Sequence, residues 1–161
     1  MTTSKKKAII IIAIIAAIAI AVVVIIVSVN GSKNKGAYYE KRWSIDLPND
    51  MKSEFETGQT HMDGSVKYTV FTCKTEQDEF LNGIGKHLPK DTFERYVNQA
   101  IAGLVRDMPT EWRPDFESDY QCAYFVGVDG NRATYLYIAY FPDSKIMMLC
   151  QDVRQYAHEL N

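Results

Sequence analysis

The most hydrophobic stretch of the chain is residues 8–29, AIIIIAIIAAIAIAVVVIIVSV, which contains no charged residue, proline or glycine. As an α-helix these 22 residues would be about 33 Å long, enough to cross the roughly 30 Å hydrocarbon core of a bilayer. The segment is apolar on all sides, whereas a surface helix of a soluble protein keeps a polar face. The pattern therefore predicts a transmembrane helix, with the lipid bilayer as its partner.

The residues on either side of this helix predict its orientation. Residues 1–7 carry three consecutive lysines, and such clusters remain in the cytoplasm, so the C-terminal part is expected outside it. Ala19-Ile20-Ala21 resembles a signal-peptide cleavage site, but it lies in the middle of the apolar run, which favours a retained signal anchor. Residues 30–36 (NGSKNKG) predict a short flexible linker before an extracytoplasmic domain at residues 37–161.

Beyond the linker, apolar and polar residues alternate with the period of two that is typical of β-strands. Asp63-Gly64 and Asp129-Gly130-Asn131 mark turns between them. The predicted strands form two meanders, the first at residues 38–47, 51–60 and 65–74 and the second at residues 118–128, 132–141 and 146–153.

One segment between the meanders has helical periodicity instead. Residues 91–108 place Phe93, Val97 and Ile101 on one stripe, and Asp91 with Glu94 matches a capping box. A helical turn is also expected near residues 78–81, and a short closing helix at residues 154–160. The order β-β-β-α-β-β-β-α predicts an α+β domain, with an antiparallel sheet and one main packing helix.

Charge narrows the range of partners. The chain has 20 acidic residues against 18 lysines and arginines, and five of those cations precede residue 37, so the predicted domain carries 13 cations and a net charge of −7. A domain this acidic repels nucleic acid, which we exclude as a partner.

The residues that could perform chemistry are scattered. Cys73, Cys122 and Cys150 occur singly, which predicts small buried side chains or a Cys122–Cys150 disulfide rather than zinc ligands. His61 lies two residues from Asp63, a pair that could move a proton, but solvated turn residues are the favoured interpretation. We therefore expect no catalytic residues, no metal and no cofactor.

Aromatic residues are the most suggestive feature of the second meander. Both faces of residues 132–141 carry large side chains, and Tyr124, Tyr135, Tyr137 and Tyr140 lie on neighbouring predicted strands. One interpretation is an exposed binding patch for a protein or glycan of the cell envelope. The favoured alternative is a tyrosine-rich core.

Trp43-Ser44-Ile45-Asp46-Leu47-Pro48, followed by a meander, a capped helix and a second meander, resembles domains of the PsbP/Mog1-like group found in membrane-anchored envelope proteins. This resemblance implies a binding or accessory role without catalytic residues. Two alternatives remain: an envelope hydrolase that uses acidic residues or the His61 region, and a subunit of a larger membrane complex. In the second, the small residues of the span would pack against another helix; they are Ala13, Ala16, Ala17 and Ala21.

Overall fold

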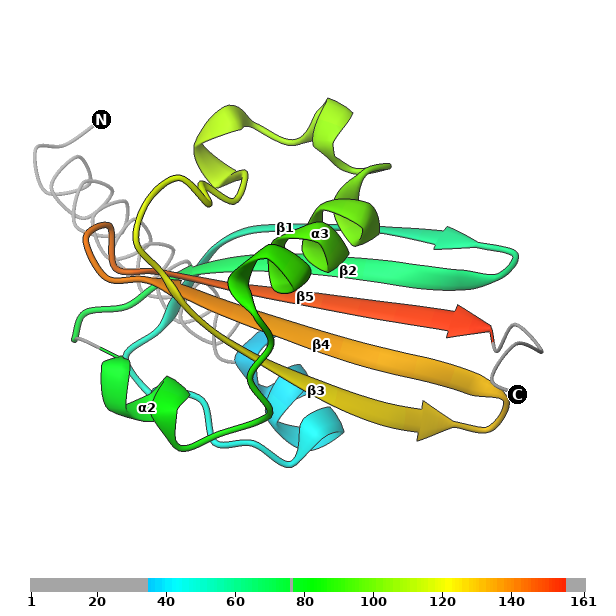
Figure 1. The fold of residues 1–161 in the computed structure, drawn as a ribbon, viewed down its shortest axis with the longest axis horizontal. Coiled ribbons are helices and arrows are strands. Elements are labelled where there is room, and N and C mark those ends of the chain that lie inside the picture. The colour runs from blue at the N-terminus through cyan, green and yellow to red at the C-terminus, as the bar shows by residue number, and fades with distance from the viewer. Residues whose placement is uncertain (1–34, 76, 156–161) are drawn as a thin grey trace, which may run out of the picture.

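A computed structural model describes residues 35–75 and 77–155 (Figure 1). Its centre is a five-stranded antiparallel sheet in the order β1-β2-β5-β4-β3. The strands are β1 (Lys52–His61), β2 (Gly64–Thr72), β3 (Gln121–Asp129), β4 (Arg132–Phe141) and β5 (Ile146–Gln155). The helices include α2 (Asp78–Asn82) and α3 (Lys90–Ile101), and 3₁₀ turns are formed by Val105–Asp107 and Thr110–Trp112. The predicted α+β class is confirmed.

The sheet is assembled from two meanders, as the alternation predicts, but they join in the middle of the sheet. The first contributes β1 and β2, and the second contributes β3, β4 and β5. The last strand returns beside β2, with Gly64 opposite Arg154 and Thr72 opposite Ile146. The long connection through α2 and α3 therefore runs from β2, near the middle of the sheet, to β3 at its far edge.

The first predicted strand is wrong, because residues 35–43 form an α-helix. Tyr39 and Trp43 are four residues apart, so they share a helix face as well as a strand face. Ser44, with a φ of 51°, follows the last helical residue. Ile45 and Leu47 are buried in an extended segment outside the sheet, so their alternation reflects burial rather than strand pairing.

The main helix is shorter than predicted and has a different start. α3 buries Phe93, Val97 and Ile101, which confirms the apolar stripe, but it ends at Ile101 and a 3₁₀ turn follows. The capping box is wrong: Pro89 precedes the first helical residue without a side-chain cap. Glu94 instead accepts a hydrogen bond from the Tyr120 hydroxyl at 2.8 Å, because it points toward the sheet.

The remaining helical predictions have different outcomes. The helical turn near residues 78–81 is confirmed as α2. At the C-terminal end, Arg154 and Gln155 belong to β5 instead of a helix, and residues 156–160 lie outside the described ranges. The predicted membrane span at residues 8–29 also lies outside them, and among the described residues no helix is long and apolar enough to cross a membrane.

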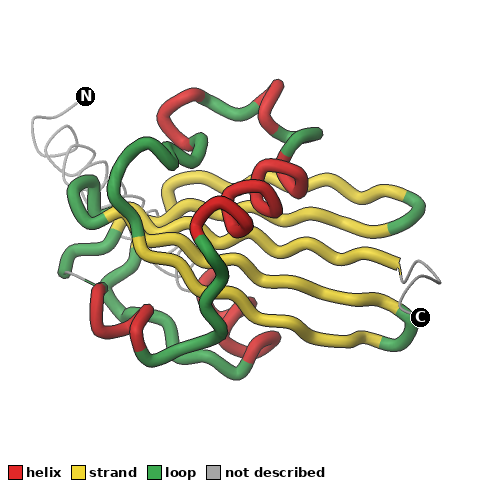
Figure 2. Tube along the Cα trace, in the orientation of Figure 1, coloured by secondary structure: helices red, strands yellow, loops and turns green. Residues whose placement is uncertain are grey.

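Both faces of the sheet are covered by the chain itself, but by different elements (Figures 1 and 2). On the face that we call the α3 face, α3 packs on Tyr68, Tyr137 and Met148. On the opposite face, the helix of residues 35–43 and α2 enclose a second cluster that includes Leu136 and Tyr140. Adjacent residues of β4 and β5 therefore belong to different cores, which explains why both parities of these strands are apolar.

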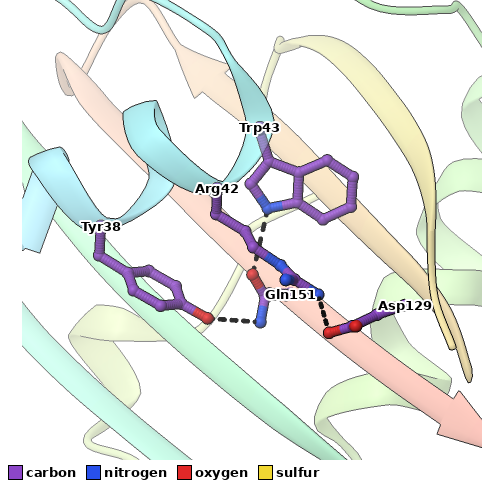
Figure 3. Close-up of polar contacts among 5 residues, drawn as sticks. All are labelled: Tyr38, Arg42, Trp43, Asp129 and Gln151. Atoms are coloured by element: carbon purple, nitrogen blue, oxygen red, sulfur yellow. Dashed lines mark hydrogen bonds and ion pairs between the residues drawn. The ribbon is translucent and has the colours of Figure 1, made fainter.

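Hydrogen bonds fix the helix of residues 35–43 to the opposite face (Figure 3). Gln151 on β5 donates from Nε2 to the Tyr38 hydroxyl at 2.8 Å and accepts at Oε1 from Trp43 Nε1 at 3.1 Å. Arg42 reaches Asp129 at 2.8 Å. The fully buried Tyr39 shares a 2.8 Å hydrogen bond with Thr69 Oγ1. Residues 35 and 36 were predicted as part of the linker. They belong instead to this helix, which hydrogen bonds attach to the sheet.

Candidate functional site

A groove opens on the α3 face, beside the helix rather than beneath it. It has a volume of about 530 Å³, within the range of roughly 300–1,000 Å³ that small-molecule sites occupy. One wall is the sheet and the other is the segment of residues 110–119, which arches away from α3 (Figure 1). We refer to this feature as the groove.

The floor of the groove is apolar. It consists of Tyr68 and Val70 from β2, Ile146 and Met148 from β5, and Phe141 at the end of β4. These residues share one face because β2 and β5 are paired antiparallel, with Val70 opposite Met148. The floor depends on a contact between the first and second meanders.

The other wall is a loop held in place by hydrogen bonds. Burial raises the pKa of Tyr68, so its hydroxyl stays protonated and donates to the Trp112 carbonyl at 2.8 Å. Arg113 donates from Nε and Nη2 to the Met108 carbonyl at 3.1 and 2.9 Å. Asp115 Oδ2 accepts from Ser118 Oγ at 2.6 Å. A wall ordered before binding lowers the entropy cost of taking up a ligand.

The rim of the groove is acidic. It carries four carboxylates and one guanidinium, in the residues Glu111, Arg113, Asp115, Asp119 and Asp143. Within the described part of the chain, an ion pair is found for Asp119, whose Oδ1 lies 3.1 Å from Lys90 Nζ. Arg113 is occupied by the Met108 carbonyl. The groove thus combines an apolar floor with a rim of excess negative charge.

The four candidate tyrosines do not form one surface. Tyr140 is fully buried on the opposite face, and Tyr137 is 3 % exposed beneath α3, where its ring meets Phe93 at 5.9 Å. Tyr124 and Tyr135 are partly exposed on the α3 face. The buried pair agrees with the tyrosine-rich core, and only Tyr124 and Tyr135 remain near the surface as candidates for binding.

The possible catalytic groups lie in separate places. His61 and Asp63 line a hollow of about 400 Å³ with Asp152 and Arg154, and the latter two form an ion pair. His87 contacts the Cys122 carbonyl through Nδ1 at 3.2 Å. In the described ranges, no three His, Cys, Asp or Glu side chains gather to hold a metal ion.

The three cysteines are free thiols. Cys122 and Cys150 lie on β3 and β5, with β4 between them, a separation of about 10 Å that exceeds disulfide reach. Burial, with a contribution from the charge of Asp50, raises the pKa of the Cys73 thiol to about 12. At neutral pH this thiol is protonated and therefore a poor nucleophile.

The groove was not predicted from the sequence, in which residues 110–117 are a mostly polar segment between the main helix and the next strand. Trp112 and Phe116, two aromatic residues within this polar segment, were the available signal that the segment packs on the sheet.

In comparisons with known proteins, no family model, curated protein or solved structure matches the chain.

Proposed function

We propose that the chain is a single-pass membrane protein whose domain acts outside the cytoplasm as a non-catalytic binding module, and that the groove is its binding site. Residues 8–29 support the anchor and the three N-terminal lysines support the orientation. The observation that carries the binding role is the groove itself, about 530 Å³ with an apolar floor and a hydrogen-bonded wall.

A binding role accounts for the described residues better than hydrolysis does. Hydrolysis needs several reactive groups that converge on one position. The groove contains none of His61, His87 and Cys73, and the separate hollow that His61 lines contains neither of the other two. Its carboxylates lie on the rim of an apolar floor, an arrangement suited to holding a ligand.

Two pairs of residues make the proposal testable in the full chain. Trp112 and Met148 line the groove, whereas Trp43 and Met147 belong to the opposite face. We would reconstitute the chain in lipid nanodiscs with 5-fluorotryptophan and ¹³C-methyl methionine, and titrate hexanol as a neutral apolar probe. Saturable shifts of the Trp112 and Met148 signals, with Trp43 and Met147 unchanged, are expected.

Equal shifts at all four reporters would mean that hexanol only partitions into the lipid, and would contradict the proposed site.

The orientation of the domain across the membrane needs a separate measurement. Protease added outside intact cells should degrade residues 37–161, and protection of this domain until the cells are lysed would overturn the extracytoplasmic location.

A further inference from the structure

We propose that the groove selects a small organic cation, a molecule with an apolar body and one positively charged end. This inference rests on the proposed function, because it names the class of ligand for the same site. It follows from the apolar floor, the charges on the rim and the size of the groove taken together.

The floor sets the apolar part of the ligand. Tyr68, Val70 and Met148 are each 1 % exposed and Phe141 is 6 % exposed, so the apolar surface open to a ligand belongs mainly to the partly exposed Trp112, Pro114 and Ile146. The Tyr68 hydroxyl already donates to Trp112. A ligand that placed a charged or strongly polar group on this floor would lose its hydration without a partner.

The rim sets the sign of the charge. Glu111 and Asp143 are exposed and line the same groove, one from the loop and the other from the turn between β4 and β5. With Asp115 and the paired Asp119, they outnumber the one guanidinium of the lining by four to one. A cation at the mouth gains from this field, and an anion is repelled.

The volume favours a small molecule over a polypeptide. A groove of about 530 Å³ can hold a compact ligand, whereas peptide recognition commonly uses an unpaired strand edge or a long helical groove. The strands that form the floor, β2 and β5, have sheet neighbours on both sides. They therefore have no edge to offer to an added strand.

The test compares three probes with the same six-carbon chain: hexylammonium, hexanol and hexanoate. In nanodiscs of zwitterionic lipid at low salt, Met148 and Trp112 should report binding of hexylammonium at least about five-fold tighter than hexanol, which corresponds to one partly screened ion pair of roughly 1 kcal/mol. Hexanoate should bind most weakly. In 1 M salt, where the screening length is about 3 Å, the preference should largely disappear.

Charge variants locate the effect. Glu111→Gln and Asp143→Asn together should reduce the preference for hexylammonium over hexanol to about two-fold or less, since the lining then holds two carboxylates and one guanidinium. Glu117→Gln is the matched control, because Glu117 lies in the same loop but does not line the groove. It changes the net charge equally per site and should leave the preference intact.

The possible results separate this inference from the proposed function. Equal affinities for hexylammonium and hexanol at the groove reporters would contradict the cation selectivity, but they would still support the groove as a binding site. Absence of any groove-specific shift would overturn both. Tighter binding of the peptide acetyl-Leu-Lys-Phe-amide than of hexylammonium would assign the groove to a polypeptide partner and contradict the small-molecule class.

Discussion

The two faces of the sheet are closed in different ways. On the opposite face, the helix of residues 35–43 is fixed by the buried Tyr39 and by the two hydrogen bonds of Gln151. On the α3 face, α3 covers the centre, and the loop of residues 110–119 stands off the sheet and leaves the groove. Both faces are apolar, and they differ in whether the covering element fills the space above the sheet.

The opposite face is covered by the helix of residues 35–43, and the groove opens on the α3 face of the sheet. A ligand in the groove would therefore not compete with that helix for the sheet. Four substitutions test the difference between the faces, from the largest expected effect to the smallest.

Tyr140→Ser should have the largest effect. Tyr140 is fully buried on the opposite face, so the loss of its ring should lower the free energy of unfolding by about 3–5 kcal/mol. Tyr124→Ser is the matched control, a partly exposed tyrosine on β3, and should cost about 1 kcal/mol. Urea unfolding of the full chain in detergent micelles, followed by Trp43 fluorescence, measures both. Equal losses would contradict the assignment of Tyr140 to the core.

Gln151→Met should have an intermediate effect. It leaves the Tyr38 hydroxyl and Trp43 Nε1 without the shared partner of their part-buried hydrogen bonds, which should cost about 1–2 kcal/mol. The same substitution in a Tyr38→Phe, Trp43→Phe background should lower the free energy of unfolding much less, because no polar group then loses its hydrogen-bond partner. Trp112 fluorescence follows unfolding in these variants. An unchanged loss in that background would show that packing, and not hydrogen bonding, fixes the helix.

Trp112→Ala should separate stability from binding. Trp112 is partly exposed, and its carbonyl, which accepts from Tyr68, is retained, so the loss of stability should be only about 1 kcal/mol. Hexanol binding, read from the Met148 methyl signal, should nevertheless weaken about ten-fold because one wall of the groove is gone. A variant that unfolds, or that binds hexanol normally, would contradict the description of this wall.

Asp129→Asn should have the smallest effect. The Arg42–Asp129 pair is exposed, with 37 % and 63 % of the two side chains accessible, and exposed pairs contribute at most about 0.5–1 kcal/mol. The difference between the variant and the original chain should vanish in 1 M salt. A loss of several kcal/mol would mean that this ion pair, rather than Gln151 and Tyr39, is the main attachment of the helix.

Much of the secondary structure could be predicted from the sequence. The alternation places all five strands within a few residues of their observed positions, and β4 at its observed bounds of Arg132–Phe141. The helix of residues 35–43 was missed because a short segment with Tyr39, Trp43, Ile45 and Leu47 fits both periods, and its burial against β5 decides between them. The capping box failed for a similar reason, since Tyr120, which is 26 residues from Glu94, competes for its carboxylate.

The sequence by itself determined the period of each strand, the apolar stripe of α3, the acidic charge of the domain and the apolar segment that predicts an anchor. These properties depend on residues a few positions apart, or on simple sums. Only the tertiary structure decided that β5 pairs with β2, that Tyr137 and Tyr140 are in different cores, and that the loop of residues 110–119 leaves a groove. Each of these depends on contacts between segments distant in the chain, and strand alternation is the same whether a face is filled by a helix or left open to a ligand.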